Sequence, residues 1–301
     1  MNDRPPRLPD LSIVCTARND DHGGRLLDRI TLCFQNIITL SERHKVNCEL
    51  IVVEWNPPLD KPRLSEVVQL PDGSSYCSVR IIQVPNELHR KYQHSDRLPL
   101  YQMIGKNVGI RRARGRMVLS TNVDILFTDA LFKFFSSGKM KEKKLYRVDR
   151  YDTNGDFNLN DDVDAQLALA LDTTFRVGAR GGSWNLDSGH YDVTLGTCID
   201  PVEYVPCRYP LHANACGDFT LMSHRDWFEL RGYWEIDAYS FHIDSILCYS
   251  AFYAGITEVC LCPPMWVHHI EHEAGWTPEN QISGVFEKRL ETSGIPKLDN
   301  E

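Results

Sequence analysis

The residues best suited to hold a cation are Asn122 and Asp124, which follow the apolar run at residues 117–119. In an extended chain, residues two positions apart point the same way, so the Asn122 amide oxygen and the Asp124 carboxylate can face one ion. Hard oxygen ligands suit Mg2+ or Mn2+, and such ions are often shared with substrate phosphates. Most Asn-x-Asp sequences are turns or helix caps, so the metal interpretation depends on the apolar strand before it.

Polar clusters follow three of the predicted strands. The apolar runs at residues 11–16, 49–55, 79–84 and 117–119 predict these strands, and helical apolar spacing separates them at residues 26–40 and 100–113. Continuous apolar strands alternating with helices indicate an α/β fold with a mostly parallel central sheet flanked by helices. Ligands of such sheets bind beyond the carboxyl ends of the strands. We therefore expect the polar clusters at residues 18–21, 54–56 and 122–124 to meet in one site.

The remainder of the chain predicts an insertion followed by further regular elements. Residues 148–206 are rich in Asp, Asn and Gly, which favours turns, and a calcium loop at 152–163 is disfavoured because Gly155 stands at position four instead of six. Residues 218–230 predict a strand that leads into a helix. Residues 244–254 predict a helix that ends at Gly255, and residues 259–261 a strand.

Composition excludes several classes of protein. The chain has 301 residues, of which 42% are hydrophobic and 25% charged, and its net charge is −8. This is the mix of a soluble globular protein that is large enough to bury a core. An acidic chain without a long basic run is a poor candidate for binding phosphate backbones, so we expect no nucleic-acid partner.

Neither a membrane span nor a secretory signal is predicted. No apolar stretch approaches the length of about 18 residues that a transmembrane helix needs, and residues 1–10 are polar. The ten cysteines are scattered and include no C-x2-C pair, which favours reduced thiols over a disulfide framework or a zinc site. We expect a cytoplasmic protein, for which peripheral contact with a membrane stays open.

Residues 106–124 carry a run of short motifs in a fixed order. An Asn at 107 is followed by Gly-Ile at 109–110, by Ala-x-Gly at 113–115, and by a strand that ends in Asn122-Val-Asp124. This run resembles the metal-motif region of glycosyltransferases with the GT-A fold, particularly those of the family 2 type. In that family the strand ends in Asp-x-Asp.

Other segments resemble the same family. Residues 17–20 resemble its first nucleotide-binding loop, and residues 217–235 resemble its acceptor-side motif. Residues 242–244, His-Ile-Asp, stand where the family has Glu-Asp before a helix. The resemblance spans residues 11–272 and implies a single Rossmann-like GT-A domain.

The resemblance also implies a division of the chain. Polar tails would occupy residues 1–10 and 277–301, and the GT-A domain residues 11–276. Within that domain, the nucleotide-binding half would cover about residues 11–130. The insertion at about 148–206 would lie on the acceptor side.

The activity implied by the resemblance is transfer of a sugar from a nucleotide-diphosphate sugar to a hydroxyl group of a carbohydrate or other acceptor. Mn2+ or Mg2+ would stabilise the departing diphosphate, and a carboxylate would accept the proton of the acceptor hydroxyl. Asp244 is the expected base, which implies inversion at the anomeric carbon, and Glu235 is the second choice. The structural alternative for Asp244 is a helix N-terminal carboxylate. Asp218 and Trp234 are the expected acceptor contacts.

Members of this family often complete the metal shell with a late histidine. We therefore expect Asp124, His269 and Asn122 as metal ligands, with polar packing or a zinc site as alternatives for His269, which could also neighbour His272 on one helical turn. The tryptophans could stack on sugar or base faces, or pack in the core. The expected contacts of the nucleotide sugar are Ala17, Arg18, Asn19, Glu54, Lys106, Asn107, Asn122 and Asp124.

Departures from the family pattern keep other functions open. Asn122 replaces the first Asp of Asp-x-Asp, Glu54 stands where an Asp-rich turn is usual, and Ile243 replaces the Glu before the base. One alternative is a retaining transferase in which Asp244 orients the substrate. Another is a non-catalytic protein that binds a nucleotide sugar or a glycan. A nucleotidyltransferase fits less well, because residues 18–21 are more acidic than its first loop normally is.

Overall fold

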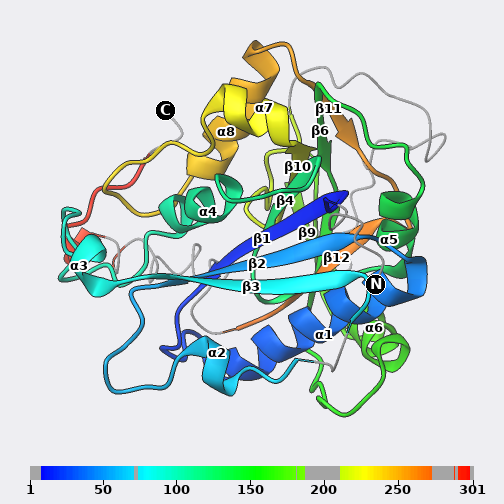
Figure 1. Cartoon of the computed structure of the whole chain (residues 1–301), viewed down its shortest axis with the longest axis horizontal. Helices are drawn as coiled ribbons and strands as arrows, with labels where there is room; N and C mark the ends of the chain where they lie inside the picture. Colours follow the sequence, from blue (N-terminus) through cyan, green and yellow to red (C-terminus); the bar gives the residue numbers. More distant parts are fainter. Residues whose placement is uncertain are drawn as a thin grey trace, which may run out of the picture.

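The computed structural model of the chain describes residues 8–70, 74–180, 182–186, 211–272, 288 and 291–298. A seven-stranded sheet with the order β11-β6-β10-β4-β1-β2-β3 forms its centre (Figure 1). These strands are β1 (Leu11–Ala17), β2 (Cys48–Trp55), β3 (Cys77–Val84), β4 (Met117–Thr121), β6 (Lys144–Arg147), β10 (Phe219–Ser223) and β11 (Thr257–Cys260). Strands β1 to β4 run parallel, as do β6 and β11, while β10 is antiparallel to both its neighbours. The sheet is therefore mostly parallel, as predicted.

Helices cover both faces of this sheet (Figure 1). The odd-numbered side chains of β1 pack with α1 and α5, whereas Val14 packs with α4, α7 and α8 on the other face. Every residue of β1 and β2 is buried, as expected for a parallel sheet covered on both sides. The helices are α1 (Leu26–His44), α2 (Leu64–Val67), α3 (Asn86–His89), α4 (Gln102–Ile110), α5 (Asp129–Ser136), α6 (Val163–Asp172), α7 (His224–Leu230) and α8 (Ile243–Tyr253).

Two glycines let α4 lie directly on the sheet. A Cβ atom on Gly109 would come 2.4 Å from Cγ1 of Val14, and one on Gly105 would come 2.6 Å from Oγ1 of Thr16. Both distances are far below van der Waals contact, so larger residues would push the helix away from β1. The close packing fixes the start of α4 beside the carboxyl ends of β1 and β4.

A second sheet with the order β5-β12-β7-β8-β9 lies beside the first. Its strands are β5 (Ile125–Phe127), β7 (Asp149–Thr153), β8 (Thr174–Ala179), β9 (Gly182–Asn185) and β12 (Trp266–Ile270). The described part of the predicted turn-rich insertion is therefore regular structure, because β7, α6, β8 and β9 all fall within it. Strand β7 is parallel to β12, and Asp152 stands opposite His269.

The strand and helix predictions for residues 11–55, 79–84, 117–119, 218–230 and 244–261 are confirmed, with shifts of a few residues at the ends. Helix α4 is shorter than the predicted 100–113. Seven described cysteines are free thiols, but Cys262 is disulfide-bonded, so the expectation of reduced thiols fails there. Within the described ranges, no helix has the length and apolar character needed to cross a membrane.

Candidate metal and donor site

Three side chains that can ligate a metal converge where β4 ends. Nε2 of His272 lies 3.2 Å from Oδ2 of Asp124, and Nε2 of His269 lies 3.8 Å from the same oxygen. Asp124 follows β4, His269 belongs to β12, and His272 comes two residues after β12. One ligand atom from each lies within 4.8 Å of the others. We call these residues the Asp–His–His group.

The orientation of His269 is set by a carboxylate on the neighbouring strand. Nδ1 of His269 lies 2.8 Å from Oδ1 of the buried Asp152. Donation of the Nδ1 proton to Asp152 leaves the Nε2 lone pair facing Asp124. A carboxylate behind a ligating histidine is the usual arrangement of metal sites, because it fixes the ring and its tautomer.

Two arginines hold Asp152 in its ionised form. Nε of Arg150 lies 3.0 Å from Oδ1 of Asp152, and Nε of Arg176 lies 2.6 Å from Oδ2. Asp152, His269 and Glu271 form a second group with ligand spacing, but Arg176 also pairs with Glu271 at 3.0 Å. Because Arg150 and Arg176 already neutralise these carboxylates, we assign no cation to this second group. It orients His269 for the Asp–His–His group instead.

The local charges favour the ionised carboxylates. Burial would raise the pKa of Asp124, but the hydrogen bond to His272 and the charge of His269 outweigh it and hold that pKa below its usual range. Burial opposes ionisation of Asp152 as well, yet Arg150 and His269 lower its pKa. Burial lowers the pKa of His269, and the hydrogen bond to Asp152 more than compensates and raises it.

The residues present fit a divalent cation. Oδ1 of Asp124 is buried and has no hydrogen-bond partner among the described residues, so it is an acceptor that an ion would satisfy. One carboxylate and two imidazoles form a mixed oxygen and nitrogen set. Such a set suits Mn2+ better than Mg2+, which prefers oxygen ligands and water.

The position of His272 depends on a glycine. Gly23 has φ +73°, and a Cβ atom there would come 2.5 Å from Nδ1 of His272. The rings of His269 and His272 lie 5.5 Å apart, but His269 is on a strand. The alternative of a shared helical turn is therefore wrong. The two rings meet at the end of β12, because His272 lies two residues beyond the strand.

Asn122 has other partners than a metal. Its Oδ1 accepts a hydrogen bond of 2.8 Å from Gln102, and its Nδ2 donates one of 2.6 Å to Oδ1 of Asp218. The chain bends at Val123 and Asp124, so the two side chains of Asn122-Val-Asp124 do not share one face of a strand. Asn122 instead links the site to α4 and β10.

The polar clusters after β1 and β2 do meet at this edge. Nε of Arg18 donates a hydrogen bond of 2.7 Å to the carbonyl of Asn56, and the Asn19 amide donates one of 2.9 Å to the carbonyl of Pro62. Glu54 is buried and accepts a hydrogen bond of 2.8 Å from the backbone of Leu64, so it caps the start of α2. These side chains shape the loops, and Ala17 is the buried last residue of β1.

Lys106 and Asn107, two of the expected nucleotide contacts, are buried on α4. Nζ of Lys106 donates a hydrogen bond of 2.7 Å to the carbonyl of Gly217, and burial lowers the pKa of this amine. The Asn107 amide bonds the carbonyl of Tyr233 and Oε1 of Glu235, both at 2.9 Å. Contact with a nucleotide would require these interactions to break, so their role in the structure is to join α4 to later segments.

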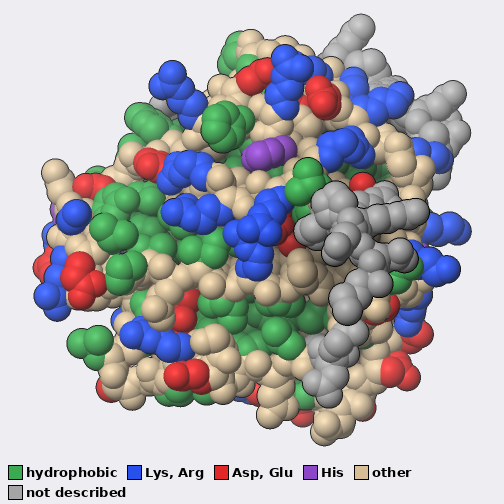
Figure 2. Space-filling model, viewed as in Figure 1, with side chains coloured by type: hydrophobic (Ala, Val, Ile, Leu, Met, Phe, Trp, Pro, Cys, Tyr) green, Lys and Arg blue, Asp and Glu red, His purple; other side chains and the backbone are tan. Residues whose placement is uncertain are grey.

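The two candidate bases lie in different surroundings. Asp244 is half-buried at the start of α8, and its Oδ2 would lie 3.0 Å from a Cβ atom on Gly217, next to Asp218 in sequence. Glu235 pairs with Arg111 at 2.7 Å. Lys and Arg side chains gather on the part of the surface over α4 (Figure 2). Glu235 thus serves an ion pair beside α4, while Asp244 faces the Gly217 turn.

The expected acceptor residues are also separated. Asp218 is buried and accepts hydrogen bonds from Asn122 and, at 2.9 Å, from Nη1 of Arg150. It therefore belongs to the network behind the metal group. Trp234 is 54% exposed, whereas Trp55 is buried against His89, Tyr92 and Tyr101. Trp276 lies outside the described residues, as do the polar tails apart from residues 8–10, 288 and 291–298.

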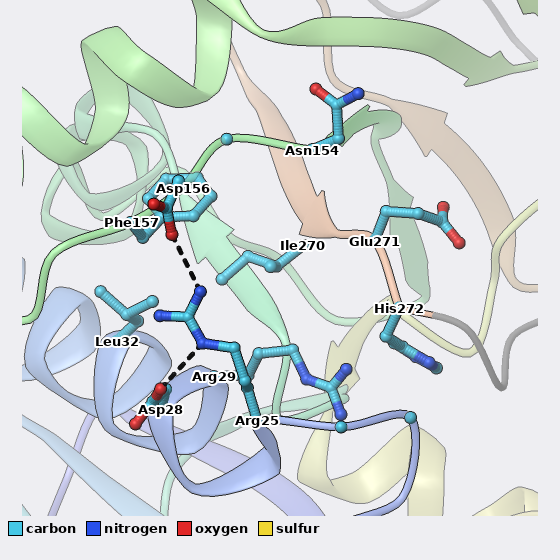
Figure 3. Close-up of a pocket in the computed structure, with 13 residues that line it drawn as sticks. Arg25, Asp28, Arg29, Leu32, Asn154, Asp156, Phe157, Ile270, Glu271 and His272 are labelled. Atoms are coloured by element: carbon cyan, nitrogen blue, oxygen red, sulfur yellow. Dashed lines mark hydrogen bonds and ion pairs between the residues drawn. The ribbon is translucent and has the colours of Figure 1, made fainter.

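Sequence reasoning missed three residues of this site, which are Asp152, His272 as a ligand candidate, and Arg29. Arg29 is buried on α1 and lines a cavity of about 750 Å3 that borders His272 (Figure 3). The close spacing of His269 and His272 was a usable signal for His272. Nothing in the sequence indicates that β7 lies beside β12, so Asp152 could not be found that way.

Comparison with known proteins agrees with the architecture. The crystal structure of S. aureus TarS, residues 1–349, matches the chain with a TM-score of 0.53 and 10% sequence identity, over 96% of this chain and 67% of that one. At this identity the likeness concerns the fold alone, which is a glycosyltransferase fold consistent with a single GT-A-like domain. No family model matches the chain, and no curated protein matches it in sequence.

Proposed function

We propose that the chain is a metal-dependent glycosyltransferase that moves a sugar from a nucleotide-diphosphate sugar to a hydroxyl group of a carbohydrate or other acceptor. The observation that supports this most is the Asp–His–His group at the end of β4. It lies at the carboxyl edge of a parallel sheet, where ligands of α/β folds bind. The shared fold with the glycosyltransferase TarS supports the same class of reaction.

Asp124, His269 and His272 would hold the ion, and their mixed donor set favours Mn2+ over Mg2+. When bound, the ion supplies Lewis-acid stabilisation of the charge that develops on the departing diphosphate. Asp152 keeps the His269 ring oriented, and the hydrogen bond from Arg150 to Asp218 keeps β7 tied to β10 behind the site. Asp152, Arg150 and Asp218 therefore act by holding the metal ligands in place, without contact with the substrate.

Asp244 is the base in this proposal. Its Oδ1 accepts a hydrogen bond of 2.9 Å from the backbone N–H of Ser245, which orients the carboxylate at the start of α8. The acceptor hydroxyl loses its proton to Asp244 as its oxygen bonds to the anomeric carbon, and the bond to the diphosphate oxygen breaks on the opposite face. Configuration at that carbon is therefore inverted.

The loops after β1 and β2 would hold the nucleotide. Arg18 and Asn19 place these loops, and the side chain of Arg18 is still 18% exposed. Lys106, Asn107 and Glu54 are left out of the proposed contacts because they are buried and already hydrogen-bonded. Trp234, which is exposed, and the sheet formed by β7 to β9 remain the proposed acceptor side.

Turnover of nucleotide sugars tests this function. Release of nucleoside diphosphate is measured from a panel of UDP-, GDP-, ADP- and CDP-sugars, with Mn2+ or with EDTA. We expect at least one donor to be consumed only with Mn2+, and Asp124→Asn to abolish that turnover. Saturable binding without any turnover would instead support a non-catalytic sugar-binding protein, and turnover that persists in EDTA would contradict the metal dependence.

A further inference from the structure

A cavity of about 750 Å3 opens between the start of α1, the loop after β7 and the end of β12. Its volume lies within the range of small-molecule sites. Leu32, Phe157 and Ile270 give it an apolar part, and His272 connects it to the Asp–His–His group (Figure 3). The cavity therefore has room for more than a metal ion and a water shell.

Arg29 is the unusual side chain of this cavity. It is 4% exposed, and its Nη2 donates a hydrogen bond to the carbonyl of His22. Its Nε and Nη1 are buried and have no partner among the residues that the structure describes. Burying charged donors without acceptors is costly, so such groups normally have a partner. A ligand with a negative charge would supply it.

The other charged groups around the cavity are already paired. Nε of Arg25 lies 3.0 Å from Asp28, and Nη1 lies 2.9 Å from Asp156. Glu271 is held by Arg176. Figure 3 shows the Arg25 guanidinium directed at Asp28 and Asp156, whereas Arg29 extends toward the side of His272. Among the described residues that line this cavity, Arg29 is thus the buried cation whose donors lack a partner.

The start of α1 adds to the positive potential. Gly23, Gly24 and Arg25 have φ angles of 73°, 73° and 50°, so three consecutive residues are in the left-handed region just before the 19-residue helix. Backbone N–H groups in such turns and the positive end of a helix dipole both favour anions. The N–H groups of Gly24 and Leu26 already donate to Asp21, so only the remaining ones are available here. This feature acts together with the unpartnered guanidinium and would not define a site alone.

We propose that this cavity binds an oxyanion, as a phosphate or carboxylate group of a ligand that extends to the Asp–His–His group, and that Nε and Nη1 of Arg29 donate hydrogen bonds to it. Two sources have this chemistry, namely the diphosphate of the donor and an acidic group of the acceptor. Naming these two sources rests on the proposed glycosyl transfer, whereas the oxyanion site itself does not depend on that function.

Calorimetric titration of anions into three variants tests the proposal. The probes are inorganic pyrophosphate, nucleoside diphosphates, glycerol 3-phosphate and galacturonate, each with Mn2+ and with EDTA. Arg29→Met keeps the aliphatic stem and removes the donors, Arg29→Lys keeps the charge, and Arg25→Met changes an arginine that is already paired. We expect Arg29→Met to weaken binding of at least one probe by about tenfold to a hundredfold, as for loss of charged hydrogen bonds.

The control and the stability of the variants complete the test. Arg25→Met should change the affinity by less than about threefold, because exposed ion pairs contribute little. Arg29→Met without ligand should melt no lower than the wild type, since it removes buried donors that lack acceptors. If Arg29→Met does not fold, Arg29→Lys is tested in its place, and its affinity is expected to lie between those of the wild type and a variant without the donors. Wild-type affinity for every probe in both Arg29 variants, or no anion binding by the wild type, overturns the proposal.

The probes also separate the two sources. Arg29-dependent binding of pyrophosphate and a nucleoside diphosphate assigns the site to the donor. Arg29-dependent binding of galacturonate or glycerol 3-phosphate, without competition from nucleoside diphosphates, assigns it to the acceptor. Failure of the proposed transferase function has a different signature, in which the wild type binds an anion through Arg29 but no nucleoside diphosphate with Mn2+.

Discussion

Nδ1 of His269 lies 2.8 Å from Oδ1 of Asp152, across the parallel pair of β12 and β7. This contact determines which ring nitrogen of His269 faces Asp124. It also connects the Asp–His–His group to Arg150 and Arg176, which hold the Asp152 carboxylate. The geometry of the candidate metal site is thus set by a residue that does not belong to it.

Replacing Asp152 tests this support. Asp152→Asn keeps the shape of the side chain but removes the charge behind His269, so we expect Mn2+ affinity to fall by about tenfold to a hundredfold. Titration calorimetry with Mn2+ measures it. Asp149→Asn is the matched control, because Asp149 lies on the same strand and pairs with His212 at 3.0 Å. Equal Mn2+ affinities in the two variants would mean that Asp152 does not act through His269.

Two adjacent glycines offer a matched pair of variants. Gly23 and Gly24 both have φ +73°, so alanine at either position costs about 1–2 kcal/mol of stability. A Cβ atom on Gly23 would also come 2.5 Å from His272, whereas one on Gly24 would meet nothing within 4 Å. We expect similar losses in urea unfolding, but weaker Mn2+ binding only in Gly23→Ala. Equal Mn2+ binding in both variants would contradict the role of His272 as a ligand.

The proposed base is tested by a comparison of two carboxylates. Asp244→Asn should lower turnover by about a hundredfold to ten-thousandfold, because general base catalysis contributes that much, while the affinity for the nucleoside diphosphate stays the same. Glu235→Gln should retain most of the turnover, since Glu235 pairs with Arg111 and Asn107. Initial rates measure the turnover of both variants, and calorimetry measures their affinity for the nucleoside diphosphate. Full activity in Asp244→Asn would remove the base assignment.

Burial lowers the pKa of His89. Nε1 of Trp55 donates a hydrogen bond of 2.9 Å to Nδ1 of this ring, and Nε2 bonds the carbonyl of Ser95 at 3.0 Å, so the neutral ring satisfies both partners. The pKa of His89 in the folded state is lower than the unfolded value of about 6.5. The contribution of His89 to the free energy of unfolding is therefore complete above that value and is lost as the pH falls toward the folded-state pKa.

We therefore expect the free energy of unfolding of the wild type to exceed that of His89→Gln by more at pH 7.5 than at pH 5.5. Urea unfolding at both pH values measures the difference. Because other histidines titrate in both proteins, the comparison isolates His89. A difference that does not change with pH would show that the ring accepts a proton in the folded state without cost.

The architecture could be predicted because it depends on local patterns. The apolar runs of β1, β2 and β4 and the helical spacing of α1 are visible in the sequence, and burial of every residue of β1 and β2 explains why. Asp124 is indicated by its place after an apolar strand, and His269 is implied by the family resemblance. These two residues lie close together because β4 and β12 both end at the same edge of the fold.

What surrounds a polar side chain in the folded chain is harder to derive from the sequence. Lys106, Asn107 and Glu54 were expected to contact the nucleotide, but each turns inward and satisfies a backbone or loop group. A sequence gives no direct information on whether a polar residue near a strand end faces solvent or a neighbouring loop. Asp152 was hidden for a related reason, because its Asp- and Asn-rich surroundings are typical of turns and its pairing partner is 117 residues away.

The most direct test is a titration of nucleoside diphosphates into the wild type and Asp124→Asn, with Mn2+ and with EDTA. The proposed function predicts saturable binding of at least one nucleoside diphosphate to the wild type with Mn2+. It also predicts that EDTA or Asp124→Asn weakens this binding by about a hundredfold, the usual effect of losing a charged contact and its ion. Equal affinity in all four conditions, or no binding of any nucleoside diphosphate to the wild type, would contradict it.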